Sequence, residues 1–159
     1  MFNFINKRFL INFSIIFFIF ILDRVSKVYV INLSEENNFN ELFNSKYLDI
    51  NLIWNEGIAF GLFSFDEKYA YNFLTLLIGL VIVVIFGMIL KNDGLRKYSL
   101  IMILGGALGN FYDRVFFKAV PDFIDFHIGS FHWFIFNVSD IFISTGVILM
   151  ILIEIIFDK

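Results

Sequence analysis

The sequence predicts an α-helical membrane protein with four transmembrane helices and a small β-rich segment outside the membrane. Hydrophobic residues make up 59% of the 159 positions, and the mean hydropathy is +0.81, which lies outside the range of soluble domains. The chain also contains apolar runs long enough to cross about 30 Å of hydrocarbon. With one Pro, ten Gly and no visible linker or repeat, residues 1–159 are expected to form a single membrane domain.

Charge and cysteine content exclude several classes of function. The formal net charge is -3, and nucleic-acid binding is not expected because phosphate contacts need clustered Lys and Arg. The chain has no Cys, so it has no thiol nucleophile, no disulfide framework and no lipidated cysteine of its own.

Four runs are expected to span the membrane: 9–31, 69–90, 98–116 and 137–157. The first is interrupted by Asp23, Arg24 and Lys27. Because these charged residues stand where a cleaved signal peptide would have small residues, we expect a retained helix. The second run has no charged residue within it and is the clearest of the four. The third carries a strip of small residues on which a neighbouring helix can pack closely: Gly105, Gly106 and Gly109.

The distribution of charged residues predicts the orientation of the chain. The segment from Lys91 to Lys97 has three basic residues and one acid, and Lys7 and Arg8 precede the first span, so both segments are expected in the cytoplasm. With four spans, both termini are then cytoplasmic. The acidic segment 32–68 is expected on the outer face, where "YLDINLIW" is typical of a strand and "NEG" of a turn.

Ionisable residues from separate segments are expected at one depth near the outer side. At 1.5 Å per helical residue, Asp23 and Asp113 lie roughly 22 and 24 Å from the inner ends of their spans. Intramembrane charges usually face protein or water and mark function. Helical spacing places Asp23 beside Lys27, and places Asn110 beside Asp113 and Arg114. Structural ion pairs, Asp23 with Lys27 and Asp113 with Arg114, are one interpretation of this spacing.

Three acids remain without a neighbouring base: Asp122, Asp125 and Asp140. Two carboxylates close together in a poorly solvated site cannot both ionise easily, so one holds a proton while the other acts as a base. An aspartic peptidase needs this arrangement to activate water. The alternative is a small ion-coupled transporter or channel subunit that uses Asp23 or Asp140, although such carboxylates belong near the midplane of the membrane.

His127 and His132 lie close to these acids in the sequence and are candidate metal ligands. Their i, i+5 spacing is not that of two zinc ligands on one helix face, and no H-E-x-x-H motif occurs. We therefore expect no metal site and place both histidines at the membrane interface.

Five blocks, in order along the chain, resemble the motifs of the lipoprotein signal peptidases (signal peptidase II), the aspartic peptidases of the bacterial inner membrane. The blocks are "LDRVSK" (22–27), "NEGIAFG" (55–61), "GGALGNFYDRV" (105–115), "VPDFIDF" (120–126) and "FNVSD" (136–140). They resemble the family patterns D-x-x-[ST]-K, N-x-G-x-A-F-G, G-G-A-x-G-N-x-x-D-R, V-V-D-F and F-N-x-A-D.

This resemblance implies that Asp122 and Asp140 are the catalytic pair, and it gives Asp125 no catalytic role. It implies an endopeptidase that cuts a diacylglyceryl-modified prolipoprotein just before the lipidated cysteine, at the outer face of the membrane. Asn55 and Gly57 would line the substrate groove. The remaining implied polar supports are Asn110, Arg114, Asn137, Asp113, Asp23 and Lys27.

The resemblance also carries expectations about partners and localisation. It implies a multi-pass protein of the bacterial cytoplasmic membrane that contacts membrane lipids, needs no cofactor and is inhibited by globomycin-type cyclic peptides. We expect a monomer. The chain departs from the family patterns at Arg24, Lys118, Pro121, Ser139 and Ile141. Pro121 has no N–H and could shift Asp122, and the Ser139 hydroxyl is expected to hydrogen-bond a carboxylate.

Overall fold

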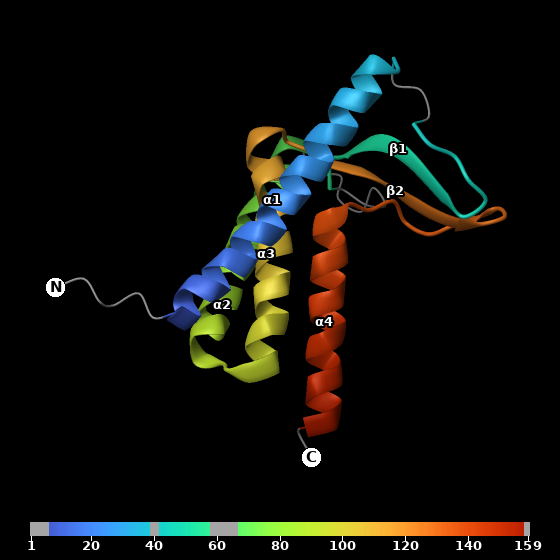
Figure 1. The fold of residues 1–159 in the computed structure, drawn as a ribbon. Helices are drawn as coiled ribbons and strands as arrows, with labels where there is room; N and C mark the ends of the chain where they lie inside the picture. The colour runs from blue at the N-terminus through green and yellow to red at the C-terminus, as the bar shows by residue number, and fades with distance from the viewer. Residues whose placement is uncertain (1–6, 39–41, 58–66, 158–159) are drawn as a thin grey trace.

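The computed structural model describes residues 7–38, 42–57 and 67–157. Within these ranges the helices form a bundle, and a small antiparallel sheet projects from one end of it (Figure 1). The elements in chain order are α1 (Lys7–Glu36), β1 (Leu48–Asn55), α2 (Glu67–Lys91), α3 (Gly94–Phe116), β2 (Val120–Ile128), β3 (Phe131–His132) and α4 (Val138–Phe157).

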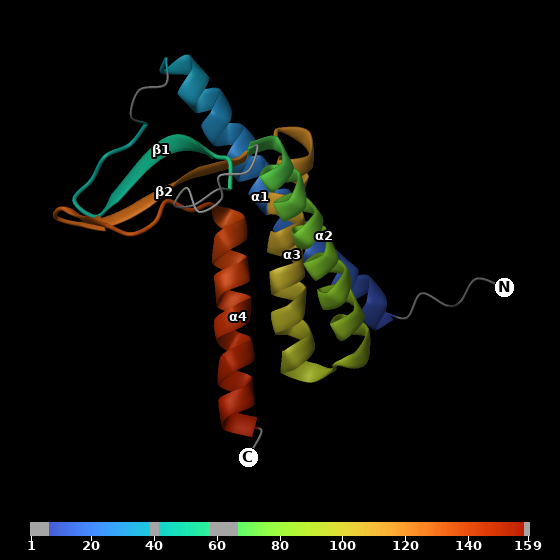
Figure 2. The same ribbon diagram turned by 180° about the vertical axis from the view of Figure 1, so that it is seen from behind.

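Helix α3 is the centre of the bundle and packs against α1, α2 and α4 (Figure 2). Its contact with α2 is apolar and buries Ile85 and Ile89 against Leu100, Ile101 and Leu104.

The predicted glycine strip brings α1 and α4 close to α3. A Cβ on Gly105 would lie 2.9 Å from Ile19 of α1, and a Cβ on Gly106 would lie 2.5 Å from the carbonyl oxygen of Ser139 in α4. Both distances are too short for any larger residue. The expectation of close helix packing at this strip is therefore confirmed.

The helices match the predicted spans in position, with differences at their ends. Helix α1 begins at Lys7 and continues to Glu36, further than the predicted 9–31. Among the described residues, α1, the Tyr71–Lys91 part of α2, and α4 are long and apolar enough to cross a membrane. Helix α3, which covers the predicted span 98–116, does not meet this standard. Because α3 faces other helices along much of its length, it can carry polar residues that a lipid-facing helix could not.

The sheet differs from the prediction in where its strands come from. Strand β1 coincides with the predicted strand "YLDINLIW", but it pairs with β2, which lies between α3 and α4. The expectation that the β-rich region lies within 32–68 is therefore only partly correct. Hydropathy and turn signals report local structure, so they could not identify a strand partner about 70 residues away. Residues 39–41 and 58–66 of the predicted outer segment lie outside the described residues.

The β1–β2 register positions the ends of both strands over the bundle. Asp49 lies opposite Asp125 and Asn55 lies opposite Val120, with an irregularity between Ile50 and Ile53. This register brings Asn55 within reach of Asp122 although the two residues are 67 positions apart. Strand β3 continues the sheet on the other edge of β2.

Candidate active site

Asp140 lies in the first turn of α4, where it forms a reciprocal cap with Asn137. The Asn137 side-chain oxygen accepts the backbone N–H of Asp140 at 3.2 Å, and an Asp140 carboxylate oxygen accepts the backbone N–H of Asn137 at 3.1 Å. This Asn-x-x-Asp arrangement is a variant of the capping box. It fixes the Asp140 side chain, and the N-terminal end of the helix favours its negative charge.

Asp122 lies in β2 and is 4% exposed. Each of its carboxylate oxygens accepts one amide N–H, from Asn55 at 2.8 Å and from Asn137 at 2.6 Å. Burial raises the pKa of Asp122 above its usual range, and the nearby charge of Asp140 raises this pKa further. The two amide hydrogen bonds and the positive charge of Lys27 oppose this rise.

Asn137 contacts both carboxylates, so it holds the two predicted catalytic residues together. Its side-chain N–H donates to Asp122 while its backbone N–H donates to Asp140. Asn110 of α3 reinforces the arrangement, because its side-chain N–H donates to Asp140 at 2.8 Å and its oxygen accepts from Asn137 at 3.2 Å. Since Asn137 is completely buried, its position is fixed by the surrounding protein.

Below this carboxylate pair lies a buried ion cluster, formed by Asp23, Arg24, Lys27 and Asp113. The Arg24 guanidinium binds Asp113 through both terminal nitrogens, one at 2.7 Å, and binds Asp23 at 2.8 Å. The Lys27 ammonium lies 3.0 Å from Asp23 and 2.7 Å from Asp113. Two acids and two bases make the ion cluster formally neutral, which a buried group of charges requires.

Lys27 links the ion cluster to the carboxylate pair. Its ammonium also donates to the side-chain oxygen of Asn110 at 2.9 Å, and Asn110 in turn donates to Asp140. Because its oxygen faces these donors, the Asn110 amide N–H must point at Asp140. Lys27, together with Asn137, therefore determines which group Asn110 presents to the site.

The structure corrects the predicted ion pairs. The Asp23–Lys27 pair is confirmed, but Asp113 pairs with Arg24 and Lys27 and not with Arg114. The sequence identifies Arg24 as a charge within the first span and as a departure from the family pattern, but it does not predict its role in the ion cluster. Arg24 is adjacent to Asp23 in the sequence and faces Asp113 only through the packing of α1 on α3, which helical spacing does not reveal.

Gly57 lies in the turn that follows β1, and the side chain of Arg114 from α3 lies beside it. Gly57 has φ of 82°, its N–H donates to the Asn55 side-chain oxygen at 2.8 Å, and the predicted "NEG" turn is thus present. The backbone conformation favours glycine at this position, and a Cβ there would lie 2.9 Å from Arg114 Nη1 and displace the guanidinium. Within the described part of the chain, the buried Nε and Nη1 of Arg114 have no hydrogen-bond partner.

Ser139 joins α4 to α1 through its backbone and not through its hydroxyl. Its backbone N–H donates to Asp23 at 3.0 Å, whereas its buried hydroxyl oxygen has no hydrogen-bond partner among residues 7–38, 42–57 and 67–157. The expected hydroxyl–carboxylate hydrogen bond is therefore wrong. Gly109 allows this close approach, since a Cβ there would lie 2.6 Å from an Asp23 carboxylate oxygen.

Asp125 does not join the carboxylate pair. It is three residues beyond Asp122 on the same strand, so its side chain points to the opposite face of the sheet. There it is hydrogen-bonded to His132 at 2.9 Å.

Comparison with known proteins supports the resemblance seen in the five sequence blocks. Residues 15–157 match the family model described as signal peptidase (SPase) II. The lipoprotein signal peptidase of Pelagibacter ubique (strain HTCC1062) is 51% identical over 153 residues, which cover 96% of this chain and 92% of the relative. That of Anaplasma phagocytophilum (strain HZ) is 36% identical over 148 residues, which cover 93% of this chain and 94% of the relative.

Solved structures agree with this assignment. Two bacterial membrane enzyme structures, 27% and 29% identical to this chain, superpose with TM-scores of 0.67 and 0.71. Each comparison covers 93% of this chain, with 91% and 94% of the respective solved chain. The family model, the curated relatives and the fold all agree, and the chain therefore belongs to the signal peptidase II family.

Proposed function

We propose that this chain is the aspartic endopeptidase that removes the signal peptide from diacylglyceryl-modified prolipoproteins, with Asp122 and Asp140 as its catalytic pair. One observation carries the assignment of the pair: a single buried residue, Asn137, donates hydrogen bonds to both carboxylates. Membership of a peptidase family gives no support to the transporter or channel alternative.

We assign the starting proton of the pair to Asp122. Burial raises the pKa of Asp122 and favours its protonated form, so in this mechanism Asp122 starts as the acid and Asp140 acts as the base. Asp140 takes a proton from water as the water oxygen attacks the scissile carbonyl carbon. Asp122 gives its proton to the carbonyl oxygen. When the C–N bond breaks, the proton on Asp140 passes to the leaving nitrogen, and the hydroxyl proton returns to Asp122.

Arg114 and the Asn55–Gly57 turn are suited to hold the substrate peptide. The buried Nε and Nη1 of Arg114 have no partner among the described residues, and carbonyl oxygens of a bound peptide would satisfy them. Gly57 keeps this region open because any side chain there would contact the guanidinium.

We place all four helices across the bacterial inner membrane, with the sheet and the active site on the outer face and both termini in the cytoplasm. The 23 residues of α3 would reach about 34 Å at 1.5 Å per residue, which is long enough for a crossing. The start of α1, the α2–α3 connection and the end of α4 lie at the end of the bundle away from the sheet (Figure 1). That end carries Lys91, Arg96 and Lys97, as expected of a cytoplasmic side.

On this proposal, residues 1–159 act as one membrane domain and as a monomer. The outward-facing side chains of α1, α2 and α4 are apolar and would contact membrane lipids directly. A cyclic peptide of the globomycin type would inhibit the enzyme by occupying the groove beside Asp122 and Asp140.

Cleavage of a synthetic precursor tests this function. The purified chain should convert a diacylglyceryl-modified precursor into a product whose first residue is the lipidated cysteine, as read by mass spectrometry. The same peptide without the diacylglyceryl group should turn over far more slowly, because the binding energy of the acyl chains is lost. Equal turnover of both peptides, or a cut at another bond, would contradict the proposed substrate.

The pH dependence of cleavage should respond to the Asn55 hydrogen bond. Activity should fall as the pH rises through the upper apparent pKa of the pair, because the shared proton is then lost. The Asn55 N–H stabilises ionised Asp122, so Asn55→Ala should raise the pKa of Asp122 further. The alkaline limb of the kcat/KM profile should consequently move to higher pH.

The exposed residue Asn37 supplies the control for this measurement. Its side-chain N–H donates to the carbonyl oxygen of Leu33 on α1, and the residue lies outside the carboxylate pair, so Asn37→Ala should leave the alkaline limb unchanged. A shift of the limb to lower pH in Asn55→Ala would show that Asn55 favours the protonated form.

A further inference from the structure

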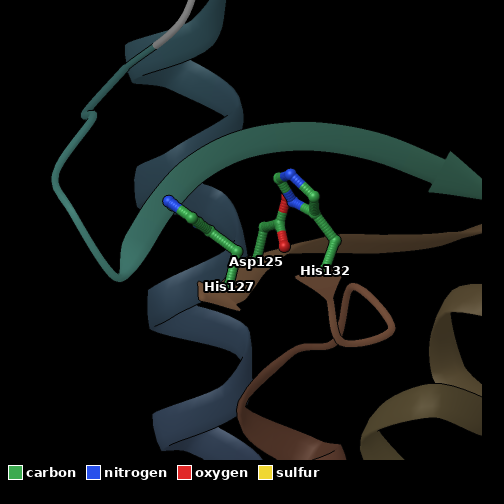
Figure 3. A group of neighbouring side chains, drawn as sticks. All are labelled: Asp125, His127 and His132. Atoms are coloured by element: carbon green, nitrogen blue, oxygen red, sulfur yellow. The ribbon is translucent and has the colours of Figure 1, made fainter. Parts of the chain in front are cut away.

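A second group of ligand-type side chains lies on the sheet, separate from the carboxylate pair. Asp125 and His127 come from β2 and His132 from β3; the Asp125 carboxylate meets the His132 ring, and the His127 side chain lies beside them (Figure 3). One ligand atom from each lies within 4.8 Å of those from the other two.

The β2–β3 hairpin explains how these side chains meet. His127 is directly opposite His132, and Ile128 is opposite Phe131. Gly129, with φ of 62°, begins the two-residue turn between the strands. An i, i+5 spacing separates two residues on a helix, but across this hairpin it places the imidazole rings 4.9 Å apart, centroid to centroid. The sequence argument against a metal site assumed helical spacing, and that assumption is wrong for this segment.

The carboxylates on this face of the sheet are only partly satisfied, by His132 at Asp125 and by the backbone N–H of Ser45 at Asp49. Asp49 of β1 lies directly opposite Asp125, and both residues are 8% exposed. Like charges directly opposite in a sheet are destabilising. Asp125 Oδ1 and His127 Nδ1 are buried without a hydrogen-bond partner among the described residues, although His127 Nδ1 lies 3.7 Å from Asp49 Oδ2. Such buried polar atoms without partners are costly unless a ligand satisfies them.

We propose that this group binds one divalent transition-metal ion of the zinc class, with Asp125, His127 and His132 as ligands and Asp49 as the neighbouring carboxylate. Two imidazoles and carboxylate oxygens suit Zn²⁺, whereas Mg²⁺ and Ca²⁺ prefer oxygen ligands alone. The ligand atoms lie up to 4.8 Å apart, farther than in a bound site, so the half-exposed His132 side chain, which is hydrogen-bonded to Asp125, would shift when the ion binds. The ion would join β1, β2 and β3, and it stands outside the proposed peptidase chemistry.

The composition of the chain makes this proposal easy to test. His127 and His132 are the two histidines of the full sequence, which has no Cys. The full-length protein, purified without a polyhistidine tag and treated with a chelator, should bind Zn²⁺ one to one by calorimetry. Saturation should also raise its melting temperature, because the ion binds only the folded sheet. Mg²⁺ should do neither.

Single substitutions locate the binding. His132→Asn should weaken Zn²⁺ binding by at least about 100-fold, since loss of an outer partner alone costs 10- to 100-fold. This side chain is half exposed, so the variant should fold. Asp93→Asn, which removes an exposed carboxylate between α2 and α3, should bind Zn²⁺ like the wild type.

Two results would overturn the metal site. If the wild type shows no saturable Zn²⁺ binding, this group of side chains does not hold a metal ion. If His132→Asn binds Zn²⁺ as tightly as the wild type, the binding is adventitious. Either result leaves the proposed peptidase function intact, because precursor cleavage is measured separately.

Discussion

Asp122→Asn and Asp140→Asn are each expected to lower kcat for cleavage of a diacylglyceryl prolipoprotein by about 10²- to 10⁴-fold, the usual contribution of general acid–base catalysis. Asn at position 140 cannot take a proton from water. Asn at position 122 cannot deliver an acidic proton to the scissile carbonyl. Because both steps use one shared proton, the double variant should be little worse than either single variant.

The measurement is a single-turnover assay with the product identified by mass spectrometry. Asp93→Asn makes the same chemical change at an exposed position between α2 and α3, and it should retain wild-type activity. Melting temperatures should show that the inactive variants remain folded.

A second substitution at position 122 is needed to interpret the loss of activity in Asp122→Asn. An Asn side chain would turn an N–H toward Asn55 or Asn137, both of which donate to Asp122 in the structure. Asp122→Ala avoids this clash between donors and should be equally inactive. Wild-type turnover in a folded Asp122 or Asp140 variant would refute the catalytic pair.

The helices could be predicted from the sequence because a membrane imposes a local requirement. Each crossing needs about 20 mostly apolar residues, and runs of that length are visible without knowing the fold. Helix α3 shows the limit of this signal. It packs against other helices, so fewer of its side chains need to be apolar, and hydropathy alone identifies it less clearly as a membrane span. The strand β1 was likewise visible in "YLDINLIW", while its pairing with β2 was not.

The site depended on contacts that no spacing rule contains. Asn55 meets Asp122 across 67 positions, and Arg24 meets Asp113 across 89. Local patterns identified candidate acids but left three of them open, and only resemblance to a family singled out Asp122 and Asp140. For His127 and His132 the spacing rule itself is misleading, because it holds for helices and these residues face each other across a hairpin.

Lys27→Met is expected to lower the free energy of unfolding by about 3–5 kcal/mol, the cost of removing one partner from a buried ion pair. The Lys27 side chain is 1% exposed and contacts the carboxylates of Asp23 and Asp113, which are completely buried. With Met at this position, Arg24 alone faces both acids, and one negative charge remains without a partner. Thermal unfolding in detergent should reveal the loss.

A surface pair supplies the matched control for this change. Lys97 lies 3.1 Å from Asp93 at the same i, i+4 type of spacing, but Asp93 is 89% exposed. Exposed pairs are worth at most about 1 kcal/mol, so Lys97→Met should unfold close to the wild-type temperature. Equal melting temperatures for Lys27→Met and Lys97→Met would show that the buried ion cluster does not stabilise the fold.

A second substitution separates charge balance from the other contact of Lys27. Lys27→Met with Asp113→Asn leaves Arg24 facing Asp23, so the ion cluster is neutral again and part of the lost stability should return. Activity should stay low in this double variant, because the Asn110 oxygen keeps only its longer hydrogen bond from Asn137 and its N–H is held less firmly toward Asp140. Recovery of stability without activity would therefore show that Lys27 both balances the buried acids and orients Asn110 toward the catalytic pair.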